Sequence, residues 1–70
     1  MIKTGQVYQH KRTPEIKLAI LYTEDDLGLV YCVKKCGMTF VFHDYIFNDY
    51  KLVAEFDTWQ KAVNSREFNR

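Results

Sequence analysis

Two short apolar runs joined by a tight basic turn, between Leu29 and His43, constrain the fold of this chain most strongly. Residues 29–33 and 39–42 are rich in β-branched and aromatic side chains, which suit a pleated, half-buried strand. Gly37 lies between the runs and can adopt a positive φ angle without a steric clash. The pattern therefore predicts a β-hairpin with a two-residue loop at Cys36 and Gly37.

The register of this hairpin decides which side chains face the core. The predicted loop sets Cys32 opposite Val41 and Tyr31 opposite Phe42. Because side chains alternate along a strand, one face of the hairpin is wholly apolar and the other is mixed. The apolar face, predicted to be the core, carries Leu29, Tyr31, Val33, Met38, Phe40 and Phe42. The mixed face, predicted to be the outer one, carries Val30, Cys32, Lys34, Thr39, Val41 and His43. A slip of one residue would exchange the two faces.

Three further strands are predicted, over residues 5–10, 17–22 and 50–56. Their alternation sets Leu18, Ile20, Tyr22 and Leu52 toward the core. Pairing Tyr22 with Leu29 across the acidic turn at residues 23–28 places the apolar faces of both hairpins on the same side of the sheet. The segment 44–49 has no clean period and is expected to be a turn with one 3₁₀ turn, anchored by Ile46 or Phe47.

A short helix is predicted near the C-terminus, at about residues 58–65. Asp57 is a good N-cap, and Gln60 has the spacing of a capping box. Trp59 shares one helical face with Ala62 and Val63. A helix of about two turns does not persist alone in water. We therefore expect it to dock on the sheet with Trp59 as its anchor.

These elements predict one mainly β domain over residues 1–70, with a single short C-terminal helix. Consecutive strands with tight connections favour an antiparallel meander. Five strands in so short a chain, with a bent segment before the last strand, predict a small SH3-like barrel. The alternative is an open antiparallel sheet backed by the helix.

The opening GQVYQHK, the compact succession of strands and the closing FDTWQKAVNS resemble the small, uncharacterised SH3-like proteins that phages and prophages encode. The likeness covers the whole chain in outline. It implies a phage-type accessory protein with no assigned chemistry, and it supplies no site residues.

The sequence predicts no catalytic residue, metal site or cofactor. Two histidines (His10 and His43) and two cysteines are ligand types, but the cysteines are spaced across a strand and a turn. A Cys–His nucleophile needs both groups within hydrogen-bond reach, and no histidine is expected near Cys36. The acidic residues 24–26 are adjacent in a turn and do not converge on a cleft. We therefore expect a protein that is not an enzyme.

Composition limits the binding partners and the cellular compartment that we expect for this protein. The formal net charge is +1, from 10 basic and 9 acidic residues, which is unlike a strongly basic nucleic-acid-binding domain. No apolar run approaches the roughly 20 residues that span a bilayer, and no signal-peptide pattern opens the chain. The expected location is the cytoplasm, which is the host cytoplasm if the protein is phage-encoded, with no membrane partner.

Charge placement suggests a binding site at one end of the sheet. In a meander, successive turns alternate between the two ends, so residues 24–26 and 44–49 form an acidic end. The predicted basic end carries His10, Lys11, Arg12, Lys34 and Lys35. Separated charges steer encounters and set the orientation of a partner. The predicted function is a small non-enzymatic binding module that meets an acidic protein surface. Weak nucleic-acid binding by the basic turns is the alternative.

Apolar positions on the predicted outer face suggest a second surface. They are Ala19, Leu21, Val30, Cys32, Val41 and Val53. A lone small sheet does not leave so many apolar side chains exposed. Either the C-terminal helix covers them, with Trp59 as an interface anchor, or the outer faces of two subunits pair. The chain is thus expected to be a monomer or a homodimer, and a homodimeric structural protein is the third functional hypothesis.

Overall fold

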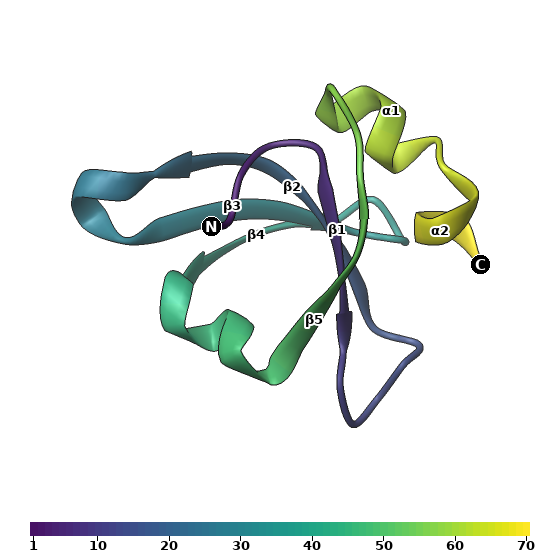
Figure 1. Cartoon of the computed structure of the whole chain (residues 1–70), viewed down its shortest axis with the longest axis horizontal. Coiled ribbons are helices and arrows are strands. Elements are labelled where there is room, and N and C mark those ends of the chain that lie inside the picture. Colours follow the sequence, from purple (N-terminus) through teal and green to yellow (C-terminus); the bar gives the residue numbers. More distant parts are fainter.

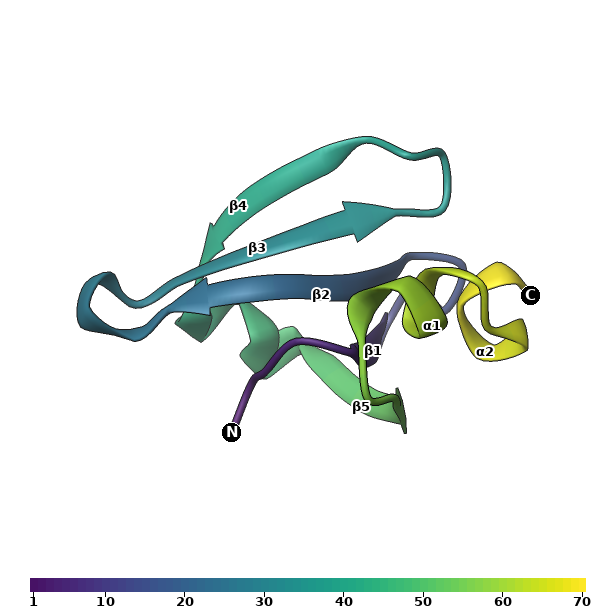
Figure 2. The same cartoon turned by 90° about the horizontal axis from the view of Figure 1, so that it is seen from above.

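The computed structural model describes all 70 residues and forms one antiparallel sheet with the strand order β4-β3-β2-β1-β5 (Figure 1). The strands are β1 (Gln6–His10), β2 (Lys17–Glu24), β3 (Leu29–Lys34), β4 (Thr39–His43) and β5 (Tyr50–Glu55). The helices are the 3₁₀ helices η1 (Asp25–Leu27) and η2 (Asp44–Asp49) and the α-helices α1 (Trp59–Val63) and α2 (Arg66–Asn69). Figure 2 shows β4 at one edge of the sheet and β5 at the other. The mainly β class is confirmed, and the open-sheet alternative fits because the barrel does not close.

Both faces of the sheet carry a buried cluster. The face that packs on η2, called the inner face below, buries Tyr8, Leu18, Ile20, Val30, Cys32 and Phe47. The opposite face, called the outer face, buries Val7, Ala19 and Val33 against Ala62 of α1 and Phe68 of α2. The inward placement of Leu18 and Ile20 and the anchoring of the 44–49 segment by Phe47 are therefore confirmed.

The predicted register of the β3–β4 hairpin is wrong by one residue. The N–H of Lys34 donates to the carbonyl of Met38 over 2.9 Å, which leaves a three-residue loop, 35–37, with Gly37 at φ +93°. Cys32 consequently pairs with Phe40. The face assignment of β3 is reversed, because Cys32 is buried on the inner face while Tyr31 turns to the outer face. A three-residue loop closed by a left-handed glycine is an ordinary alternative to the two-residue loop.

The predicted β2–β3 register is also wrong, for a different reason. The strand β2 continues to Glu24, which pairs with Leu29, and the pairing shifts by one residue between Ile20 and Tyr22. The bulge at Leu21 turns Tyr22 from the inner face to the outer one, where it stacks on Tyr31. A bulge of this kind re-aims every side chain that follows it.

The last strand places fewer residues in the core than its alternation predicts. β5 pairs with β1 rather than with β4, and a bulge interrupts this ladder between the partners of Val7 and Tyr8. Leu52 is 45% exposed, so its predicted burial is wrong. Tyr31 and Phe40, also predicted to be buried, are only partly buried. Leu52 and Phe40 lie on the edge strands β5 and β4, which have a neighbouring strand on one side only, whereas Tyr31 is exposed because the reversed β3 places it on the outer face.

The C-terminal segment forms two short helices instead of one. Thr58, not Asp57, caps α1 by accepting a hydrogen bond from the N–H of Lys61, over 3.2 Å. Ser65 caps α2 through the N–H of Phe68, which is only 2% exposed. Docking of the segment on the outer face is confirmed, but Ala62 and Phe68 anchor it rather than Trp59. Neither helix is long and apolar enough to cross a lipid bilayer.

Candidate functional site

The first part of the predicted basic end is built from the loop after β1. The imidazole Nδ1 of His10 accepts hydrogen bonds of 3.1 Å from the N–H of Arg12 and of the residue after it. The His10 ring packs edge-on against Tyr50, with 4.9 Å between centroids. Lys11 Nζ donates to the carbonyl of Asn48 over 2.9 Å. Of the three basic residues here, only Arg12 makes no side-chain bond within the chain.

The second part of the basic end contacts the C-terminal helix. Lys34 Nζ lies 4.8 Å from the ring centroid of Phe40. Lys35 Nζ donates to the carbonyl of Arg70 over 2.6 Å, and the buried Lys17 donates to the same carbonyl over 3.3 Å. Cations beside the carbonyls that end a helix complement its dipole. Lys17 and Lys35 thus hold α2 on the sheet, a role that sequence reasoning missed for Lys17.

Charge separation between the two ends of the sheet is incomplete. The 3₁₀ helix η2 begins where β4 ends and finishes beside the start of β5, where Tyr50 pairs with His10. The N–H of Lys11 accordingly donates to the carbonyl of Asp49 over 2.9 Å. The prediction that all of residues 44–49 lie at the acidic end is therefore wrong, because η2 crosses the inner face from one end to the other.

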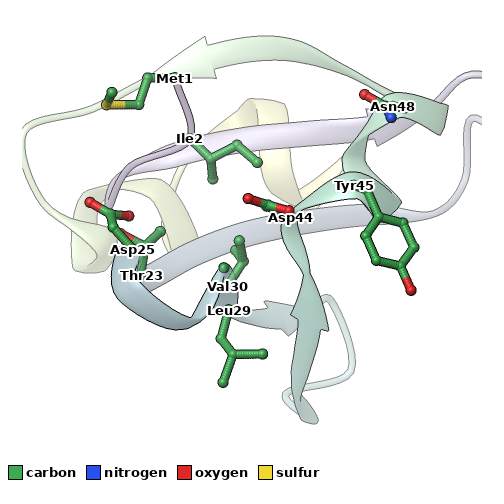
Figure 3. Close-up of a pocket in the computed structure, with 10 residues that line it drawn as sticks. Met1, Ile2, Thr23, Asp25, Leu29, Val30, Asp44, Tyr45 and Asn48 are labelled. Atoms are coloured by element: carbon green, nitrogen blue, oxygen red, sulfur yellow. The ribbon is translucent and has the colours of Figure 1, made fainter.

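The largest hollow of the surface lies at the acidic end and has a volume of about 590 Å³ (Figure 3). Its lining consists of Met1, Ile2, Thr23, Asp25, Gly28, Leu29, Val30, Asp44, Tyr45 and Asn48. In the view of Figure 3, Ile2 lies between the carboxylates of Asp25 and Asp44, and the ring of Tyr45 turns away from them. No third ligand joins the two carboxylates, and no group of three potential metal ligands occurs in the chain. The lining of this hollow combines apolar side chains with two carboxylates, and no set of reactive side chains converges in it.

A second, apolar hollow separates α1 from the outer face of β2, β3 and β4. This groove, called the Trp59 groove below, has a volume of about 400 Å³. It is lined by Leu21, Tyr22, Val33, Gly37, Thr39, Trp59 and Val63. Trp59 and Val63 stand four residues apart and so share one face of α1. Trp59 is 40% exposed, because the neighbouring Ala62 seats the helix on the sheet and leaves the indole at its margin.

An aromatic pair extends the groove along the outer face. The rings of Tyr22 and Tyr31 stack with 4.3 Å between centroids. Tyr31 Oη donates to a carboxylate oxygen of Glu24 over 2.7 Å, and this bond is the main reason that the pKa of Tyr31 is raised to about 12. Val41, opposite Tyr31 on β4, is 51% exposed. The apolar strip thus runs from α1 to the sheet edge. The sequence indicated Trp59, whereas Tyr22 was assigned to the core.

The two thiols differ in environment. Cys32 is fully buried in the inner cluster, and burial raises its pKa to about 12. Cys36 is exposed in the β3–β4 loop, and both cysteines are free. A thiol whose pKa is raised by burial is protonated at neutral pH and is a poor nucleophile. Cys32 therefore acts as a small apolar core residue.

Fold and surface together define a small open antiparallel β-sheet protein with two capping helices and an apolar groove beside them. Comparisons with protein-family models, with curated proteins and with solved structures find no match to this chain. The resemblance to phage-encoded SH3-like proteins stays a prediction.

Proposed function

We propose that the protein is a small non-enzymatic binding module that acts by protein–protein contact, with the Trp59 groove as its docking surface. The observation that carries the proposal is a 40% exposed tryptophan at the margin of an apolar groove of about 400 Å³. Tryptophan and tyrosine dominate the residues that contribute most to protein interfaces. Trp59 and Tyr22 thus supply two such anchors on one surface.

The partner chemistry follows from what bounds the groove. Its walls are apolar, so the segment that enters it is an apolar side chain of the partner. Gly37 and Thr39 line one end of the groove, and Gly37 belongs to the same β3–β4 loop as Lys35. The positive charge of this loop favours a partner with a carboxylate near its apolar anchor by long-range steering of the encounter, which does not require the Lys35 ammonium to leave the carbonyl of Arg70. This combines the expected acidic partner with the surface beside Trp59.

A protein partner is favoured over nucleic acid by the contacts of the basic side chains. Binding to a phosphate backbone needs lysine and arginine side chains that are free to contact phosphates. The ammonium groups of Lys11 and Lys35 donate to backbone carbonyls of the chain itself. The rings of Tyr22 and Tyr31 stack on each other rather than standing apart to receive bases.

The test is an affinity capture from the native host with a matched pair of variants. Trp59→Ala removes the groove anchor, whereas Tyr45→Ala removes an aromatic ring outside the groove that is still more exposed. We expect the wild type and Tyr45→Ala to retain the same partner protein after nuclease treatment, and Trp59→Ala to lose it. Far-ultraviolet circular dichroism and a melting curve establish that each variant is folded.

Two outcomes would overturn the proposal. A partner that Trp59→Ala binds as well as the wild type does would move the docking surface away from the groove. Loss of every captured protein after nuclease treatment, together with competition by short DNA or RNA, would favour the nucleic-acid alternative.

A further inference from the structure

The strand β4 has a free side that is fixed by its ladder with β3. The N–H of Lys34 donates to the carbonyl of Met38 over 2.9 Å, and the N–H of Asp44 donates to the carbonyl of Gly28 over 2.8 Å. Residues of an antiparallel pair alternate between those that bond to the neighbour and those that face away. The backbone groups that face away from the sheet therefore belong to Thr39, Val41 and His43. Figure 2 shows no strand beside β4 on that side.

The two edges of the sheet differ in how they are protected. β5 carries the charged residues Lys51 and Glu55, and a bulge interrupts its ladder. Charges and bulges are the devices by which natural proteins prevent pairing at a sheet edge. β4, with the sequence TFVFH, has no acidic residue, lysine, arginine or proline, and its ladder is regular. The edge at β4 is therefore open to a further strand, whereas the edge at β5 is guarded.

We propose that β4 pairs in antiparallel fashion with β4 of a second copy of this chain, about a two-fold axis at Val41. In this register Val41 exchanges two backbone hydrogen bonds with its own equivalent. Thr39 exchanges two more with His43 of the second copy, and the symmetry repeats them. Every backbone group on the free side of β4 then has a partner, which is the self-complementarity that an isologous dimer requires. Any antiparallel strand could fill these backbone bonds, so it is the side chains and charges of β4 that favour a second copy.

The side chains of β4 suit the same register. Phe40 and Phe42 are partly buried on the inner face, with parallel rings and 5.8 Å between centroids. The two-fold axis places Phe40 beside Phe42 of the second copy, and aromatic cross-strand pairs stabilise antiparallel sheets. Val41, 51% exposed, meets its own equivalent on the outer face. The proposed β4–β4 interface therefore covers apolar surface on both faces of the sheet.

The charges near the ends of β4 are complementary in this register. Lys34 and Met38 form one pair of the β3–β4 ladder, and the two-fold axis places Asp44 of the second copy beside Met38. Lys34 and that Asp44 lie two strands apart in one row, at about 10 Å between Cα atoms. A lysine side chain spans most of this separation. Lys34 of one copy thus approaches Asp44 of the other at both ends of the β4–β4 interface.

The decisive experiment is analytical ultracentrifugation of variants that carry a charge at Val41, the centre of the proposed β4–β4 interface. Val41→Lys and Val41→Glu each set like charges against each other across the axis, and Val53→Lys makes the same change at the guarded edge. Val41 and Val53 are both exposed, so the monomer tolerates the substitutions. We expect the wild type and Val53→Lys to pass from monomer to dimer with rising concentration. Each Val41 variant should dimerise at least about tenfold more weakly, which corresponds to about 1.4 kcal/mol.

An equimolar mixture of Val41→Lys and Val41→Glu should regain the dimer, since opposite charges then face each other. Hydrogen exchange gives the second readout: the amides of Thr39, Val41 and His43 should gain protection with concentration, and those of Phe40 and Phe42 should be protected throughout. A wild type that remains monomeric at millimolar concentration overturns the proposal. So does a Val41→Lys variant that dimerises normally while Trp59→Lys does not, because the outer faces would then form the contact. No partner protein is needed, so this test is independent of the proposed function.

Discussion

The rings of Tyr22 and Tyr31 stack 4.3 Å apart on the outer face because a single bulge at Leu21 shifts the pairing of β2 with β3. Without the bulge, the alternation from Ile20 would direct Tyr22 to the inner face. The displaced tyrosine instead lines the Trp59 groove. The bulge thus supplies Tyr22, one of the two aromatic anchors of the proposed docking surface.

Trp59 and Phe68 should respond very differently to truncation. Trp59 is 40% exposed, whereas Phe68 is 2% exposed in the outer cluster. Phe68→Ala should lower the free energy of unfolding by about 3–5 kcal/mol, as large-to-small changes of buried aromatic residues do. Trp59→Ala should cost about 1 kcal/mol or less, since its ring remains partly hydrated. Denaturant unfolding measures both, and equal losses would show that the indole is a structural anchor after all.

The Tyr31–Glu24 hydrogen bond predicts an alkaline titration. The pKa of Tyr31 is about 12 in the folded chain against an ordinary 10.0, chiefly because of the bond to Glu24. Because the folded-state pKa is the higher one, the stabilisation is fully present below pH 10 and is lost as the pH rises toward 12. Glu24→Gln should lower the pKa of Tyr31 toward its ordinary value. An NMR titration of the Tyr31 ring, assigned with Tyr31→Phe, separates this group from Tyr8 and Tyr50, whose pKa values burial also raises. An unchanged pKa of Tyr31 in the variant would contradict the assignment.

Lys17 should matter more than a surface lysine. It is buried, and its Nζ donates to the carbonyls of Glu67 and Arg70. Lys17→Met should destabilise the protein by about 1–3 kcal/mol, because the carbonyls that end α2 lose a charged donor. Lys61→Met, which breaks only an exposed ion pair, is the matched control and should cost less than about 1 kcal/mol. Amide exchange in α2 should accelerate in the first variant only, and similar rates in both would refute this role.

Two glycines with positive φ should tolerate alanine unequally. A Cβ at Gly5, where φ is +88°, would collide with the carbonyl oxygen of Phe56. That carbonyl belongs to the residue whose N–H donates to Gly5 itself, so the backbone cannot move away without losing the contact. A Cβ at Gly37 would meet open space, which leaves only the conformational strain of about 1–2 kcal/mol. Gly5→Ala should therefore lower the melting temperature much further than Gly37→Ala, and the reverse order would contradict the packing described.

The alternation of apolar residues was sufficient to predict all five strands, because burial of one side of a strand leaves a period of two. It also identified Leu18 and Ile20 as core residues and Phe47 as the anchor of η2. The hairpin registers were not predictable in this way. Gly37 is compatible with loops of two or three residues, and the choice between them exchanges the faces of Tyr31 and its neighbours.

The candidate site was predicted only in part, for related reasons. Trp59 was recognisable as a large apolar residue on a helix too short to bury it. Tyr22 was not, since nothing in an unbroken apolar strand indicates where a bulge falls. Thr58 and Asp57 are both good N-caps, and only the docked helix distinguishes them. The roles of Lys17 and Lys35 depend on where the last helix ends, which is a tertiary contact with no local signature.

Fluorine NMR of Trp59 tests the proposed docking most directly. The chain has a single tryptophan, so incorporation of fluorotryptophan gives one resonance located in the groove. Titration with the captured partner should shift or broaden this resonance in proportion to the bound fraction, and short DNA or RNA should leave it unchanged. A resonance that stays in place while the partner binds to saturation would contradict the proposal that the Trp59 groove is the docking surface.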